Sequence, residues 1–110
     1  MKKTFTIVAC LVLFIACSPK FVIPVQMDVD RIQTEIPGYT LSDLQTGMEH
    51  YKTNCGNCHG LKRPGSRTPE EWKKIVPEMV KKANKKEVKI SPETERSILN
   101  YLITMGKRKK

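Results

Sequence analysis

The sequence predicts a small all-α protein with three main helices. Three amphipathic segments recur along the chain, and each follows a serine or threonine that can cap a helix N-terminus. No segment shows the alternation of apolar and polar residues that a half-buried strand requires. The helices are expected at 43–54, at 69–83, and from Pro92 to a stop signal at Gly106.

The first predicted helix starts with a capping box, in which Ser42 and Gln45 satisfy each other's backbone N–H groups. Its apolar stripe is formed by Leu44, Met48 and Tyr51. Gly47 lies on the same stripe, although glycine inside a helix costs about 1 kcal/mol relative to alanine. Close approach of a second helix at Gly47 would justify that loss.

The second predicted helix starts with a capping box between Thr68 and Glu71, and Pro69 fits its first turn. One continuous apolar face follows, made of Trp72, Ile75, Val76, Met79, Val80 and Ala83. Pro77 removes one backbone donor within this helix and is expected to kink it.

The third predicted helix starts at Ser91, which is again followed by a proline. Its buried stripe is formed by Ile98, Leu99, Tyr101, Leu102 and Met105. Residues 107–110 are expected to be a solvated basic tail near the negative end of the helix dipole.

The part of the chain left to fold is short. Of the 110 residues, 1–16 are expected to be a signal peptide and 17–40 a tether, which leaves 41–106 as the folded domain. A core of this size rarely stabilises itself without a disulfide, a metal or a bound cofactor. The length also excludes a large enzyme with its own substrate domain.

The N-terminus predicts export and lipidation. Lys2 and Lys3 precede an uncharged apolar run that is too short to span a bilayer. The run ends in Ala16-Cys17, which resembles the lipobox of bacterial lipoproteins. The resemblance implies that Cys17 is diacylated, becomes the first mature residue and anchors the protein to a membrane on its periplasmic side. The alternatives are an uncleaved anchor or cleavage elsewhere, and Cys10 is a less suitable acceptor because little apolar sequence precedes it.

Positive charge is concentrated in the second half of the chain. Residues 60–110 carry fifteen basic and six acidic residues, net +9, whereas residues 17–59 carry three basic and five acidic, net −2. One interpretation is a solvated helix face, and the other is a docking face for an acidic protein partner or an anionic membrane surface. Nucleic acid is not an expected partner, because the chain is expected to be exported and no aromatic residues are interleaved with the basic ones.

The motif with the clearest chemistry is Cys55-Gly56-Asn57-Cys58-His59. The C-x-x-C-H pattern is typical of covalent c-type haem attachment. Two thiols at this spacing can add to the two vinyl groups of the porphyrin, and the adjacent histidine can then ligate the iron. A Cys55–Cys58 disulfide would be expected after a strand in an α/β pattern, which is lacking here. A zinc site would need four ligands, and the mature domain has no second Cys/His pair.

With this motif the chain resembles a small single-haem cytochrome c of the class I type. The resemblance covers residues 41–106 and also rests on Gly47, Tyr51, Tyr101 and Leu102, which match the positions where the family's first and last helices cross. It implies a cytochrome c-like helical fold around one covalent haem c, with His59 as the proximal iron ligand and a methionine as the usual distal ligand. The chain departs from the family in the middle, where the helix at 69–83 replaces a long methionine-bearing loop.

Several residues are therefore candidates for the distal ligand of the haem iron. Met79 lies on the apolar face of the second predicted helix and is the first candidate; the alternative is that it is one more core residue of that face. Met105 is the second candidate, and a vacant site or another ligand such as His50 remains open. Arg63, Arg67 and Trp72 follow the motif, and either they bind the haem propionates or they belong to a solvated loop.

These observations predict an electron-transfer protein with one haem and no catalytic activity. No Ser/His/Asp set is visible, and no paired carboxylates face an apolar pocket at helical spacing. Two other functions stay open: a haem-based ligand binder or sensor with a vacant sixth site, and a permanently docked haem subunit of a larger respiratory or dehydrogenase complex.

Overall fold

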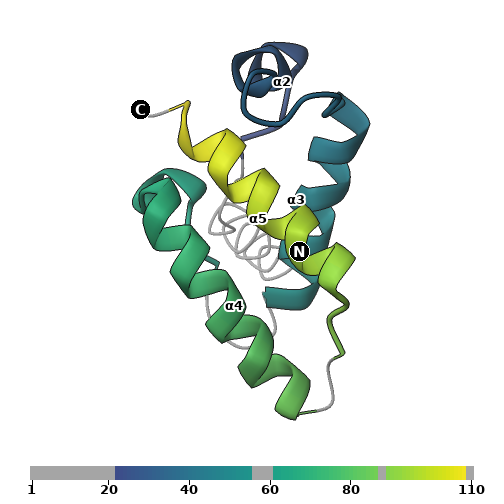
Figure 1. Ribbon diagram of the computed structural model, residues 1–110, viewed down its shortest axis with the longest axis vertical. Coiled ribbons are helices and arrows are strands. Elements are labelled where there is room, and N and C mark those ends of the chain that lie inside the picture. Colours follow the sequence, from purple (N-terminus) through teal and green to yellow (C-terminus); the bar gives the residue numbers. More distant parts are fainter. Residues whose placement is uncertain (1–21, 56–60, 87–88, 109–110) are drawn as a thin grey trace, which may run out of the picture.

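The computed structural model describes residues 22–55, 61–86 and 89–108. Within these ranges the chain is helical and contains no strand, as Figure 1 shows, so the predicted all-α class is confirmed for this part. The helices are α2 (Gln26–Ile32), α3 (Leu41–Cys55), the short 3-10 helix η1 (Pro64–Ser66), α4 (Pro69–Lys85) and α5 (Pro92–Gly106). None of these helices is both long and apolar enough to cross a membrane.

Two of the three predicted caps are confirmed. Thr68 Oγ1 accepts a hydrogen bond from the Glu71 N–H at 3.1 Å, and Glu71 Oε1 accepts one from the Thr68 N–H at 2.8 Å. Ser91 Oγ likewise accepts from the Thr94 N–H at 3.1 Å. Helix α4 continues through Pro77 to Lys85.

The predicted cap of α3 is wrong. Thr40 and Asp43, not Ser42 and Gln45, exchange the two capping hydrogen bonds, each at 3.0 Å. Both pairs have the spacing of a capping box, but the Asp43 carboxylate adds a negative charge at the positive end of the helix dipole. The helix therefore begins two residues earlier than predicted.

Helix α5 is the element around which the fold is built. Helices α2, α3, α4 and η1 all pack against it, and in Figure 1 it crosses α3 with α4 alongside. Its side chains Ile98, Tyr101 and Leu102 are almost completely buried. Leu44 of α3 and Trp72 of α4 complete the centre of the core.

Gly47 lies at the crossing of α3 and α5, as its position in the sequence predicted. A Cβ atom at Gly47 would lie 2.5 Å from the Ser97 carbonyl oxygen and 2.8 Å from Tyr101 Cβ. The Ser97 oxygen is a backbone atom and Tyr101 Cβ is the first atom of its side chain, so neither atom can rotate away. The close packing of the two helices therefore requires glycine at this position.

The Gly47→Ala variant is expected to be less stable than the wild type by about 2–3 kcal/mol, because the added methyl group separates α3 from α5. Chemical unfolding followed by circular dichroism measures the difference. Gly65→Ala is the matched control, since a Cβ atom at Gly65 meets nothing within 4 Å. Equal stability of the two variants would contradict the tight crossing.

Hydrogen bonds fix the chain on the C-terminal side of the C-x-x-C-H motif. Tyr51 Oη donates to the Lys62 carbonyl at 2.7 Å and accepts from the Lys62 N–H at 3.1 Å. Trp72 Nε1 donates to the Pro64 carbonyl at 2.8 Å, and its ring meets that of Tyr51 edge-on at a centroid distance of 6.4 Å. Burial raises the pKa of Tyr51 to about 12, so the hydroxyl keeps the proton that it donates.

Helix α2 lies in the segment for which the sequence predicted a tether and no helix. Val29 and Ile32 of α2 are buried in the core, and the helix packs against α5 and α3. The Asp28 carboxylate is completely buried and accepts two hydrogen bonds from the Arg108 guanidinium, at 3.0 and 2.6 Å. Arg108 was expected in a solvated tail, but here it joins the end of α5 to α2.

The buried Asp28 carboxylate links stability to pH. Burial acts to raise the pKa of Asp28, but hydrogen bonds from Arg108, the Val25 N–H and Arg31 outweigh it and lower the pKa from its ordinary 3.8. For a lowered pKa, the stabilisation is fully present above the unfolded value and is lost as the pH falls through the folded value.

Asp28→Asn is expected to lower the free energy of unfolding by about 2–3 kcal/mol at pH 7, because it leaves Arg108 without its charged partner. The difference in unfolding free energy between the variant and the wild type should be smaller at pH 3, because protonation of Asp28 begins to remove the same stabilisation from the wild type. Urea unfolding at both pH values measures this, with the exposed Asp30→Asn of the same helix as the control. A loss of the same size at both pH values would mean that the carboxylate charge is not what stabilises α2.

Candidate functional site

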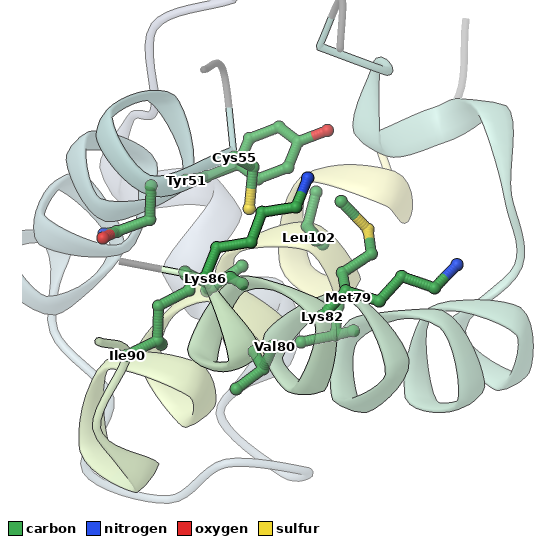
Figure 2. Close-up of a pocket in the computed structure, with 12 residues that line it drawn as sticks. Tyr51, Cys55, Met79, Val80, Lys82, Lys86, Ile90 and Leu102 are labelled. Carbon is green, nitrogen blue, oxygen red and sulfur yellow. The ribbon is translucent and has the colours of Figure 1, made fainter. Parts of the chain in front are cut away.

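A pocket lies between α3, α4 and α5, beside the C-terminal end of α3 (Figure 2). Its cavity volume is about 140 Å³. Helices α3 and α4 both pack against α5, and their packing against each other is slight by comparison. The described residues that line the pocket are Tyr51, Asn54, Cys55, Val76, Met79, Val80, Lys82, Ala83, Lys86, Ile90, Ile98 and Leu102.

Two sulfur-bearing side chains line the pocket from different helices. Cys55 is the last residue of α3 and is half-buried, and Figure 2 shows its sulfur directed from α3 toward α4. Met79 lies on α4 and is also half-buried. Helix α4 begins at the predicted cap, and its apolar face packs against α5. Met79 lies at the edge of that face and lines the pocket.

The remaining residues of the C-x-x-C-H motif cannot be placed. Cys58 and His59 lie outside the described residues, and so does Cys17, the predicted lipidation site. The structure thus brings Cys55 and Met79 to one pocket, and the roles assigned to these two and to the other three residues stay predictions.

The alternative distal ligands do not line this pocket. Met105 is buried within the core on α5 and is not among the lining residues. His50 is half-buried on α3, its carbonyl accepts a hydrogen bond from Asn54 at 2.9 Å, and it too is absent from the lining. Among the candidate iron ligands within the described ranges, only Met79 borders the pocket.

The residues considered for binding propionates have different surroundings. The Trp72 indole N–H already donates to the Pro64 carbonyl, so it is engaged within the fold. Arg63 is exposed and Arg67 is half-buried on the loop before α4. None of these three residues lines the pocket.

Two lysines at the pocket were missed in the sequence analysis. Lys82 and Lys86 are exposed residues of α4 and its C-terminal end, and both border the pocket. Figure 2 shows Lys86 reaching toward α3 and Lys82 extending away from the pocket. They follow Met79 by three and seven residues, which is the spacing of one helix face, so this signal was present in the sequence. Ile90, after α4, carried no comparable signal.

The chemistry of the pocket is that of an apolar site with a cationic rim. Its described lining has two lysines and no acidic residue, which suits an apolar ligand that carries negative charge. Within the described residues no group of three or more His, Cys, Asp or Glu side chains could hold a metal ion. A metal at this pocket would therefore need ligands from outside the described ranges or a sulfur ligand such as Met79.

Comparison of the chain with models of protein families, with curated proteins and with solved structures finds no match.

Proposed function

We propose that the protein is an electron-transfer protein that carries one haem c bound covalently through Cys55 and Cys58. The observation that carries the proposal is that Cys55, the first residue of the C-x-x-C-H motif, borders an apolar pocket that Met79 also borders. His59 is the proposed proximal ligand of the iron, and Met79 is the proposed distal ligand. In this assignment one helix supplies the first attachment point and another supplies the distal ligand.

The described residues suit such a ligand in three respects. The apolar side chains of α4 and α5 give a low-dielectric surface for a porphyrin ring, and Lys86, which reaches toward α3, offers positive charge to its carboxylates. The slight packing between α3 and α4 leaves a place for a cofactor to join them. A bound cofactor would also supply the stabilisation that so small a core requires.

A haem c in this site supplies a one-electron couple between ferrous and ferric iron. The chain's own contribution is to exclude water from one side and to present charge to a partner. Helix α4, which carries Met79, also has three exposed lysines: Lys73, Lys74 and Lys81. We propose that they favour a redox protein partner with an acidic docking surface.

The test of the proposal is the reduced-minus-oxidised absorbance spectrum of the exported protein, together with a haem stain on a denaturing gel. A c-type spectrum and a stain that survives denaturation are expected. A protein without haem, whose cysteines form a disulfide or bind zinc, would overturn the proposal. Binding of carbon monoxide by the wild type would favour a ligand binder or sensor over electron transfer, and stable co-purification with a larger complex in mild detergent would favour a docked subunit.

The proposed location is the periplasmic side of a membrane, with the protein held by a lipid on Cys17. Mass spectrometry of the mature N-terminus is expected to show a chain that starts at Cys17 and carries the mass of a diacylglyceryl group. Cys17→Ser should abolish this modification, while Cys10→Ser should leave it unchanged. An unmodified chain starting elsewhere would refute the lipid anchor.

A further inference from the structure

The largest exposed apolar side chains of the described residues are gathered in one short segment. They are Val22, Ile23, Val25 and Met27, and the exposed fractions of Ile23 and Met27 are 72% and 69%. The segment leads into α2, which lies at one end of the molecule in Figure 1, while the C-terminal end of α4 lies at the other. We call these four residues the α2 patch.

The α2 patch is held in place by buried neighbours on the opposite side of the same segment. Pro24 is buried between the exposed residues, and Asp28 and Val29 follow in the next turn. The Asp28 carboxylate accepts a hydrogen bond from the Val25 N–H at 2.9 Å and is paired with Arg108, which follows α5. The inner side of the segment is therefore fixed to the domain, and its outer side presents apolar groups to the surroundings.

The patch lies close to the proposed lipid anchor along the chain. Val22 follows Cys17 by five residues, so even a fully extended connection spans at most roughly 18 Å. The polar interface of a bilayer is about 5–8 Å thick on each side of its hydrocarbon core. With the lipid of Cys17 in the bilayer, the chain cannot carry the patch far from the membrane surface.

We propose that the α2 patch is a second membrane contact, which rests on the phospholipid interface next to the lipid of Cys17 and fixes the orientation of the domain. This inference rests on the proposed lipidation. The apolar side chains are withdrawn from water when they enter the interface, and the lipid supplies the local concentration that makes so small a contact effective. The C-terminal end of α4, the helix that carries Met79, then lies on the side away from the membrane (Figure 1).

The experiment places one cysteine in the patch and measures its access to a charged maleimide. Ile23→Cys and the control Lys85→Cys are each made in the full chain, matured with haem and reconstituted into phospholipid vesicles. Lys85 is exposed and is the last residue of α4. In the vesicles Ile23→Cys is expected to react about tenfold more slowly than Lys85→Cys, because a thiol in apolar surroundings is shielded and less ionised. The wild type should take up no label.

The same two cysteines are then compared in a Cys17→Ser background exported with a signal peptide of the non-lipoprotein class. There the two thiols are expected to react at similar rates, since no lipid holds the patch at a membrane. Equal rates in the vesicles with an intact lipid would overturn the membrane contact alone. Slow reaction of Ile23→Cys in both backgrounds would show that a second copy or another protein covers the patch. An unmodified Cys17 in the mass spectrum would overturn both the lipidation and the contact.

Discussion

The Cys55→Ser/Cys58→Ser variant is expected to show no haem stain on a denaturing gel, whereas the wild type is expected to stain strongly. Haem that is held only by ligands leaves the chain on denaturation, so the stain reports the thioether bonds and nothing else. The result does not depend on whether the variant folds, because the readout is taken after unfolding. The expected loss is complete.

Two comparisons make this result specific. Cys10→Ser removes a cysteine of the signal segment and should leave the stain at the wild-type level. The single variants Cys55→Ser and Cys58→Ser each retain one thiol at the motif and should stain less strongly than the wild type. A double variant that stains as strongly as the wild type would show that these cysteines do not attach the haem.

The Met79→Ala variant is expected to lose the weak red charge-transfer band of sulfur-ligated ferric haem and to gain carbon monoxide binding in the ferrous state. The thioether of Met79 borders the pocket from α4, and alanine cannot replace it as an iron ligand. A lower reduction potential is also expected wherever a nitrogen ligand takes the place of the sulfur. Absorbance spectra of both oxidation states, with and without carbon monoxide, measure the change.

Met105→Ala is the matched control for this second result. Met105 is buried on α5 and does not line the pocket, so its loss should lower stability while the red band persists. Retention of the band in Met79→Ala and its loss in Met105→Ala would reverse the assignment. A wild type that lacks the band and binds carbon monoxide would indicate a vacant sixth position.

Local sequence signals were sufficient to predict the elements that are stabilised by residues close to one another in the sequence. Thr68 and Glu71 cap α4 as predicted because both partners of the capping box lie within one turn. Gly47 indicated the helix crossing because a glycine inside an amphipathic helix has few other uses. The cap of α3 was misplaced because two overlapping pairs had the same spacing, and only the folded chain shows that Thr40 and Asp43 are the ones that pair.

Helix α2 could not be predicted, because what stabilises it lies at the other end of the chain. Asp28 and Arg108 are separated by 80 positions, and a window of local periodicity cannot detect such a pair. Prolines on either side of the helix also obscured its pattern. At the candidate site, Met79 was found through its place on an apolar stripe, whereas Ile90 lies between α4 and α5 and belongs to no such stripe.

The position of α5 at the centre of the fold has a consequence for the order of events during biosynthesis. Every other described helix packs against α5, yet α5 is the last of them to be synthesised. Until it emerges, α3 and α4 lack the helix against which each of them packs most, and Arg108 is not there to hold Asp28. The core therefore closes only after nearly the whole chain has been made. Cys55 stays accessible in that open chain, so the covalent haem attachment proposed above would take place before the pocket forms.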